Sequence, residues 1–152
     1  MSDVLEQLLQ EEQELQFEKF NEEDAWKLGS QLVELACSRN LPVTIDITRG
    51  THQLFHAALR GTSPDNDEWV KRKVRLVYRF GHSSFYVGQV LKSKGKTIEQ
   101  SYLVSESDYA PHGGCFPIIV KNTGIVGTVT VSGLPQEEDH KLVVQAIRKY
   151  LG

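Results

Sequence analysis

The strict alternation of apolar and polar side chains over residues 43–48 constrains the fold more than any other feature of the chain. The segment reads Val-Thr-Ile-Asp-Ile-Thr, which predicts a β-strand with one buried face. Arg49 and Gly50 then form a tight turn, and residues 51–59 are predicted to return as a second strand. Residues 117–121 and 125–132 form another β-rich pair around Asn-Thr-Gly. Strands joined by such short turns pair in antiparallel fashion.

Apolar periodicity and capping residues predict four helices, which cover residues 3–16, 21–40, 63–95 and 135–151. Gly81 interrupts the third helix, where it marks either a kink or a close approach of another backbone. Residues 97–105 alternate loosely and predict one more strand. The two prolines and two glycines of residues 108–117 predict a shaped loop.

The resulting order is α-α-β-β-α-β-β-β-α. It predicts an α/β chain of the α+β type, in which an antiparallel five-stranded sheet is layered between helices. The chain has 152 residues, which suits one domain, so residues 1–152 are assigned to a single domain.

Charge and cysteine content exclude several classes of protein. The formal net charge is −3, with 17 basic and 20 acidic residues, which argues against nucleic-acid binding. Acids gather in residues 3–24, and the basic run at residues 71–79 is typical of a solvated helix face. Cys37 and Cys115 are too far apart for a disulfide framework or a metal-binding motif. With no signal peptide and no apolar stretch long enough for a membrane span, we expect a cytoplasmic protein.

The last third of the chain carries a set of motifs that resemble a known family. His-Gly-Gly-Cys-Phe-Pro-Ile at residues 112–118 is followed by a hairpin through Gly-Ile-Val-Gly and a closing Val-Ser-Gly, at residues 124–133. This pattern resembles the HbpS/GlcG-like haem-degrading-domain family, although Phe116 is one residue more than the family's turn contains. The run Ser-Gly-Leu-Pro-x-x-x-Asp-His at residues 132–140 resembles the short cytoplasmic branch called uncharacterised protein family 0303, as does the segment from Trp69 to Lys73 leading to Ser83-Ser84.

The resemblance implies an antiparallel sheet between helices, and dimers that build larger rings or shells. For some members of the family it also implies binding and slow breakdown of haem, so haem is the candidate cofactor. Whether this chain is an enzyme stays open at this point.

His112 is the best candidate for a ligand contact, because it sits in a constrained glycine-rich loop that a ligand can approach closely. The alternative is that His112 only caps or packs in the turn. Gly113 and Gly114 either form an anion-binding nest of backbone N–H groups or serve a tight turn that the fold requires. Haem iron is held by His, Cys, Met or Tyr, and the only methionine is Met1, which removes methionine as a ligand.

Basic side chains supply the second half of the predicted site. Arg49 lies at the tip of the first hairpin, and Lys73 and Arg79 lie on the long helix. Such groups suit carboxylates, including the propionates of haem. They suit equally the acidic N-terminal helices of the same or a neighbouring subunit, since complementary charges guide association.

The other histidines do not form a metal site. His52 and His56 lie on a strand, where four residues span roughly 13 Å, so both cannot bind one metal. His140 is expected at the surface or in an interface. Three hypotheses follow: a protein that binds haem or a related small anionic ligand, a non-catalytic oligomeric scaffold or adaptor with a protein partner, and an enzyme for a small anionic metabolite.

Overall fold

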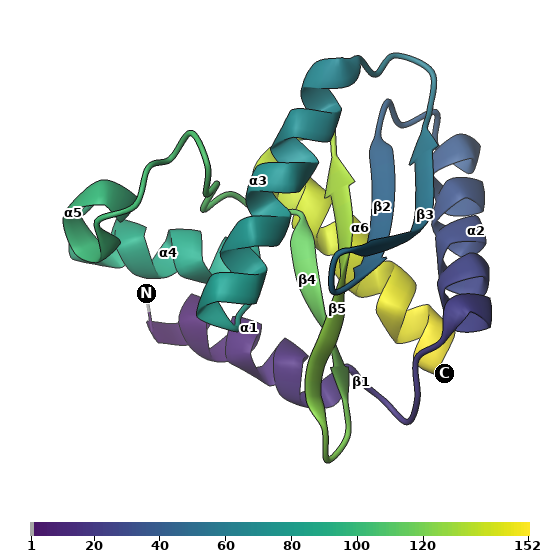
Figure 1. Cartoon of the computed structure of the whole chain (residues 1–152), viewed down its shortest axis with the longest axis horizontal. Helices are drawn as coiled ribbons and strands as arrows, with labels where there is room; N and C mark the ends of the chain where they lie inside the picture. The colour runs from purple at the N-terminus through teal and green to yellow at the C-terminus, as the bar shows by residue number, and fades with distance from the viewer. Residues whose placement is uncertain (1) are drawn as a thin grey trace.

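A computed structural model describes residues 2–152, which form a five-stranded sheet between two helical layers (Figure 1). The strand order across the sheet is β1-β4-β5-β2-β3. The strands are β1 (Gln16–Phe17), β2 (Thr44–Arg49), β3 (His52–Ala58), β4 (Cys115–Val120) and β5 (Gly124–Ser132).

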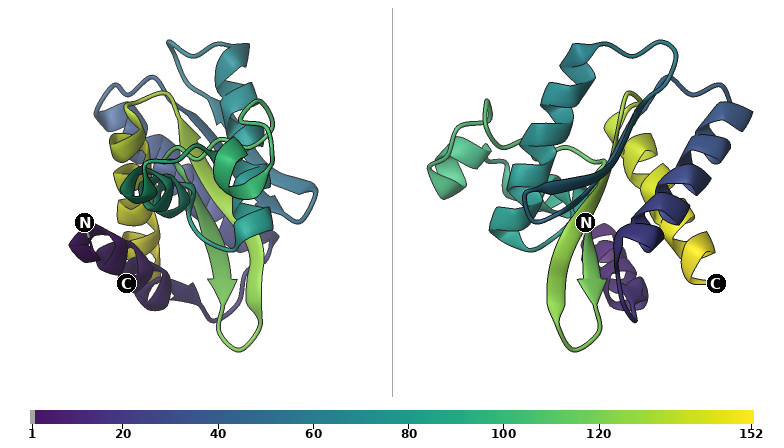
Figure 2. Two further views of the ribbon diagram at one scale, coloured as in Figure 1. Left: turned by 90° about the vertical axis from the view of Figure 1, so that its left-hand side faces the viewer. Right: turned by 45° about the vertical axis from the view of Figure 1, so that its right-hand side comes forward.

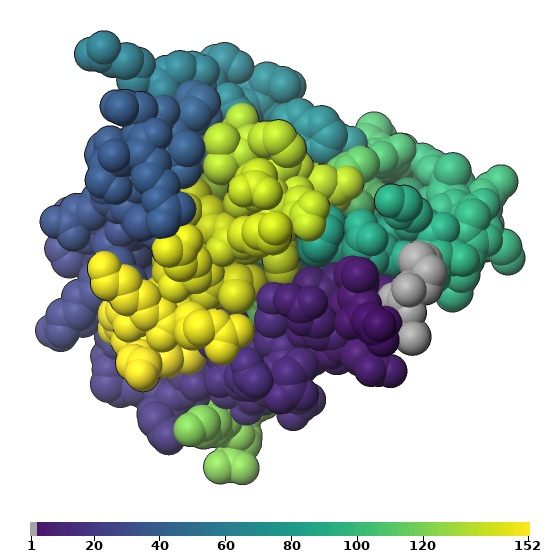
Figure 3. Space-filling view, turned by 180° about the vertical axis from the view of Figure 1, so that it is seen from behind, coloured from purple at the N-terminus to yellow at the C-terminus, as the bar shows by residue number. Residues whose placement is uncertain are grey.

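Helices cover the two faces of this sheet unequally. Helices α2 (Glu22–Ser38) and α6 (Gln136–Leu151) pack against one face, and α3 (Pro64–Phe80) crosses the other (Figures 1 and 2). Helix α1 (Ser2–Glu14) lies beside α6 on the rear face of the molecule (Figure 3). The short helices α4 (Ser84–Lys94) and α5 (Ile98–Tyr102) project beyond the sheet (Figure 1). Among residues 2–152, no helix is long and apolar enough to span a membrane.

The predicted hairpins are confirmed, but the prediction of a wholly antiparallel sheet is wrong. Strands β2, β3, β4 and β5 pair in antiparallel fashion. Strand β1, which the sequence did not predict, pairs with β4 in parallel, with Gln16 opposite Ile119 and Phe17 opposite Val120. Two residues are too few to show an alternating pattern, although Phe17 is buried.

The single long helix predicted over residues 63–95 is two helices. Gly81 takes a left-handed conformation (φ 74°) and ends α3, and the Ser83 side chain then caps α4. A left-handed residue stops a helix because its backbone cannot continue the hydrogen-bond ladder.

The strand predicted over residues 97–105 is also wrong. Thr97 and Gln100 form a reciprocal capping box that starts α5, and Leu103 ends that helix at φ 59°. The loose alternation of this segment was outweighed by the capping pair. The observed order is therefore α-β-α-β-β-α-α-α-β-β-α instead of the predicted one.

The two faces of the sheet differ in chemistry. Ile45 and Ile47 belong to an apolar core between the sheet and helices α2 and α6. Their neighbours Thr44, Asp46 and Thr48 point to the side of α3, where the Thr48 hydroxyl lies 2.9 Å from the Tyr78 hydroxyl. A second apolar core joins α3, α4 and α5. The face under α3 thus carries buried polar groups, and the opposite face carries almost none.

Candidate functional site

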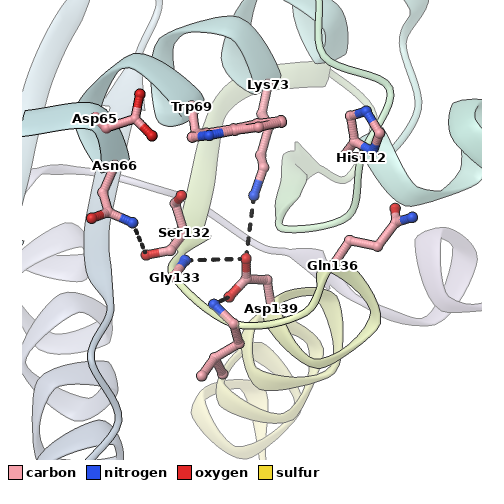
Figure 4. A pocket seen from close by; sticks show the side chains of 10 residues that line it. Asp65, Asn66, Trp69, Lys73, His112, Ser132, Gly133, Gln136 and Asp139 are labelled. Carbon is pink, nitrogen blue, oxygen red and sulfur yellow. Dashed lines mark hydrogen bonds and ion pairs between the residues drawn. The ribbon is translucent and has the colours of Figure 1, made fainter. Parts of the chain in front are cut away.

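A buried ion pair lies where α3 and α6 meet the end of β5. Lys73 Nζ lies 3.3 Å from Asp139 Oδ2, and the two side chains are only 3% and 2% exposed. Lys73 also donates to the Val131 carbonyl at 3.2 Å. Asp139 accepts hydrogen bonds from the backbone N–H groups of Gly133 and Leu134 (Figure 4). The pair is therefore anchored to the backbone at the point where β5 passes into α6.

Burial moves both members of this pair towards their neutral forms. It lowers the pKa of Lys73, although the charge of Asp139 opposes the change. It raises the pKa of Asp139 to about 6, against the opposing effect of Lys73 and the two N–H groups. Two groups perturbed in this way beside a cavity are typical of a functional site.

The cavity above the pair has a volume of about 330 Å³. Trp69 forms one wall, His112 and Gln136 a second, and the backbone at Ser132 a third (Figure 4). The Arg72 guanidinium lies 4.4 Å from the Trp69 ring centroid, which fixes the indole by a cation–π contact. The cavity therefore joins one aromatic wall to a polar floor.

His112 stands between this cavity and a second one of about 290 Å³, because both cavities are lined by His112 and Gln136. Its Nε2 lies 2.9 Å from Glu106 Oε1, and its ring meets Trp69 edge to face at 5.5 Å. The imidazole is 34% exposed, so it is held in place and still open to a ligand. Carboxylates orient metal-binding histidines in the same way.

The second cavity adds two basic side chains. Lys92 and Lys96, on either side of the left-handed Gly95 that ends α4, line this cavity. Neither forms an ion pair within residues 2–152 of the structure. Neither lysine was predicted as a site residue, because Lys92 was assigned to the end of a longer helix and Lys96 lies just beyond it.

The two glycines of the predicted nest serve close packing. A Cβ on Gly113 would lie 2.3 Å from the Gln136 carbonyl oxygen, and one on Gly114 (φ +135°) would lie 2.3 Å from that of Val131. The N–H of Gly113 already donates to Gln136 Oε1 at 2.9 Å. These contacts favour the tight-turn role over the anion-binding nest, while they place both glycines beside His112.

Two of the predicted basic residues lie away from the cavities. Arg49 pairs with Glu22 of α2, with Nη2 at 2.9 Å from Oε2, which matches the expected alternative of pairing with the acidic N-terminal segment. Arg79 is exposed and packs on the rings of Phe80 and Tyr109. Of the three predicted basic side chains, only Lys73 reaches the His112 region.

His140 was expected at the surface or in an interface, but it is buried inside the chain. The side chain is 3% exposed, its Nε2 lies 2.8 Å from Glu11 Oε1, and Phe85 stacks beside it. The acidic residue before it, Asp139, forms the buried pair described above. The motif Ser-Gly-Leu-Pro-x-x-x-Asp-His contained the signal for both residues, since it joins the end of β5 to the first turn of α6.

His56 lies on β3 as predicted, between Asp46 (2.8 Å) and Asp67 (3.2 Å). Within residues 2–152 no group of three or more His, Cys, Asp or Glu side chains is arranged to hold a metal ion. His56 thus joins a carboxylate of β2 to one of α3.

Comparisons with known proteins find the same family as the motifs of the last third of the chain. Residues 20–148 match the family model described as haem degrading protein HbpS-like. The chain is 53% identical to a UPF0303 protein of Streptomyces coelicolor, over 96% of this chain and 92% of that protein. It is 51% identical to a UPF0303 protein of Rhizobium etli, over 97% of this chain and 89% of that protein.

Solved structures share the fold. The crystal structure of Ybr137w protein superposes with a TM-score of 0.89 at 36% identity, over 96% of this chain and 86% of that one. A crystal structure of a PduOC:heme complex superposes with a TM-score of 0.70 at 17% identity, over 85% of this chain and 93% of that one. At that identity the second likeness shows the fold alone.

Proposed function

The chain belongs to the HbpS-like family of haem degrading proteins, and from that premise we propose that it binds haem, or a related anionic ligand, at His112 between the two cavities. The observation that carries the proposal is the position of His112. Its imidazole is oriented by Glu106, remains 34% exposed and borders both cavities. A histidine held by a carboxylate through one ring nitrogen can offer the other nitrogen to a ligand.

The donor set at this place fits haem. An imidazole is a common axial ligand of haem iron. Lys92 and Lys96 suit the two propionates, because neither is neutralised by a carboxylate in the described part of the chain. Cys115 is no candidate, since burial raises the pKa of its thiol to about 12 and keeps it protonated.

The remaining residues act by positioning. Glu106 holds the His112 ring, and the Trp69 indole, itself fixed by Arg72, supports that ring from the side. Gly113 and Gly114 let the loop lie directly on Gln136 and Val131, so His112 is carried on a packed turn. Iron-based redox chemistry would be supplied by the haem itself when bound.

Lys73 has a secondary part in this proposal. Its charge is balanced by Asp139 at 3.3 Å, so it offers a ligand carboxylate less attraction than the two exposed lysines do. The self-association predicted from the sequence stays a prediction. The surface that supports it is edge strand β3 with Phe55, beside the 66% exposed Trp26 of α2.

A haem titration tests the proposal, with Trp26→Phe as the background because Trp69 is then the only tryptophan. We expect saturable 1:1 binding, a Soret shift and quenching of Trp69. His112→Ala is expected to weaken haem binding at least about tenfold, which corresponds to about 1.4 kcal/mol. The matched control is His52→Ala on β3, which is exposed and lines neither cavity.

Iron-free protoporphyrin IX separates the two kinds of contact. It keeps both carboxylates, so the double variant Lys92→Ala/Lys96→Ala is expected to weaken both porphyrins, whereas His112→Ala weakens only haem. Non-saturating haem binding, or equal haem affinity of the unsubstituted protein and His112→Ala, would overturn the proposal.

A further inference from the structure

We propose that Lys73 is a carbonyl-reactive amine, and that the 330 Å³ cavity takes a small uncharged aldehyde which forms an imine with Lys73 Nζ. The inference rests on the floor of this cavity and is independent of haem binding at His112. Lys73 is the only buried lysine in the described part of the chain, and its side chain lines the cavity. Every other lysine there is exposed.

The surroundings of Nζ leave it able to react. Its two partners, the Val131 carbonyl and Asp139 Oδ2, lie at 3.2 and 3.3 Å. These distances are longer than the roughly 2.7–2.9 Å of a strong charge-assisted hydrogen bond. Gly114 keeps the space beside the amine open, because a Cβ at that position would lie 2.6 Å from Nζ. A small molecule in the cavity therefore lies next to an amine with loose contacts.

The charge state of the pair supports the same chemistry. Burial lowers the pKa of Lys73, which increases the share of neutral amine, and only the neutral amine is a nucleophile. Burial also raises the pKa of Asp139 to about 6, so this carboxyl group can carry the proton that the amine gives up.

The proposed step balances without any other reactant. The Nζ lone pair forms a bond to the carbonyl carbon while the carbonyl oxygen takes a proton from Asp139. The resulting carbinolamine loses a proton from nitrogen to the Asp139 carboxylate. Its hydroxyl group then leaves as water, with a proton supplied by Asp139, and the C=N bond forms as a protonated imine. The imine nitrogen finally returns its proton to the Asp139 carboxylate. Aldehyde and amine are thus converted to imine and water, and Asp139 relays the protons.

The walls of the cavity define the ligand class. Asp65 lines the cavity and disfavours an anion, and the nearest cation, Lys73, is already paired with Asp139, which points to an uncharged molecule. Ser132 and Asn66 offer polar groups to hydroxyls on the ligand, and Trp69 offers an apolar wall. A short aldehyde, with or without hydroxyl groups, matches this lining.

Reductive trapping on the full chain tests the inference. The protein is exposed to acetaldehyde and sodium cyanoborohydride at pH 6.5, and the hydride converts each imine to a stable ethylamine. Peptide mass spectrometry then gives a labelling rate for every lysine. We expect Lys73 to react at least about tenfold faster than exposed Lys27 of α2, because burial lowers the pKa of Lys73 and the cavity holds the aldehyde beside its amine.

The Lys73→Arg variant and the order in which the lysines are labelled complete the test. Lys73→Arg keeps a cation beside Asp139 and is expected to lose the fast ethylation phase, with labelling at Lys27 unchanged. If the natively folded unsubstituted protein is ethylated at Lys27 before Lys73, the inference is overturned. The first test needs no variant, so a failure of the arginine variant to fold does not affect it.

Discussion

The two faces of the sheet differ in the chemistry of the strand residues that they bury. On the face covered by α2 and α6, Ile45 and Ile47 are wholly buried in an apolar core that contains no catalytic type of side chain. On the face covered by α3, the intervening residues of the same strand include Thr44 and Asp46, which are also buried. The strand residues on the first face are apolar, and those on the second include buried polar groups.

Burial of polar groups is costly unless they are paired, so the polar strand residues under α3 carry a stability cost that the apolar strand residues facing α2 and α6 lack. Some of its groups are paired, as in the contacts of Asp46 with His56 and of Lys73 with Asp139. Others are not: the hydroxyls of Thr44 and Thr130 have no hydrogen-bond partner within the described residues. Natural proteins break such packing rules mainly at functional sites, and the proposed site lies beside α3 on this side of the sheet.

The largest loss of stability is expected from a cavity created in the apolar core between the sheet and helices α2 and α6. Ile47→Ala is expected to lower the free energy of unfolding by about 2–5 kcal/mol, because the side chain is fully buried and rigid neighbours cannot fill the space. Urea denaturation followed by circular dichroism measures the change. Haem affinity, extrapolated to the folded protein, is expected to stay the same.

The control for this substitution is Val4→Ala on α1, whose side chain is 43% exposed and which should cost less than about 0.5 kcal/mol. If Ile47→Ala proved as mild as Val4→Ala, the assignment of stability to this face would be wrong.

The next effect is a pH dependence on the face of α3. The pKa of Asp139 is about 6 in the folded protein, chiefly because of burial, against an ordinary value of 3.8. Between these two values the folded state keeps a proton that the unfolded state releases. Its contribution to stability is therefore complete below about pH 4 and is lost as the pH rises through 6.

Asp139→Asn isolates this contribution, since asparagine does not titrate. We expect the unfolding free energy of the unsubstituted protein, minus that of Asp139→Asn, to fall by up to about 3 kcal/mol from pH 4 to pH 7. Urea titrations at intervals of half a pH unit give the difference directly. A difference that rises with pH would mean that Lys73 outweighs burial and that the carboxyl is an ordinary ion-pair partner.

The sequence predicted the apolar face far better than the polar one. Residues 43–48 alternate strictly because one side of the strand meets a continuous core, and the segments of the hairpin at residues 117–132 are β-rich. Both elements were correctly predicted. Strand β1 was not predicted, because its two residues depend on pairing with β4 and not on a local pattern.

Prediction failed around α3 to α5 for a different reason. There the chain ends and restarts helices through single residues, Gly81 and Thr97, whose effect depends on local backbone geometry. Of the residues predicted for the site, His112 and Lys73 line one cavity, together with Trp69. Asp139 was missed as a site residue: the motif at residues 132–140 contains it, but its pairing with Lys73 joins residues 66 positions apart.

The smallest effect concerns an unpaired hydroxyl on the polar face. Thr44 is fully buried and its Oγ1 has no hydrogen-bond partner within residues 2–152. Removing a buried, unsatisfied hydroxyl relieves a desolvation cost, so Thr44→Val is expected to change stability by less than about 1 kcal/mol, in the stabilising direction. Urea denaturation at pH 7 measures this change.

Thr48, four residues along the same strand, provides the comparison for this result. Its hydroxyl lies 2.9 Å from that of Tyr78 and 2.7 Å from that of Thr128, so Thr48→Val breaks both contacts. We expect a loss of about 1–2 kcal/mol, because the partner hydroxyls lose a hydrogen bond. Opposite signs for the two threonines would show that the polar face is stabilised only where its groups are paired. Equal losses would show instead that Thr44 has a partner in solution, most simply a buried water.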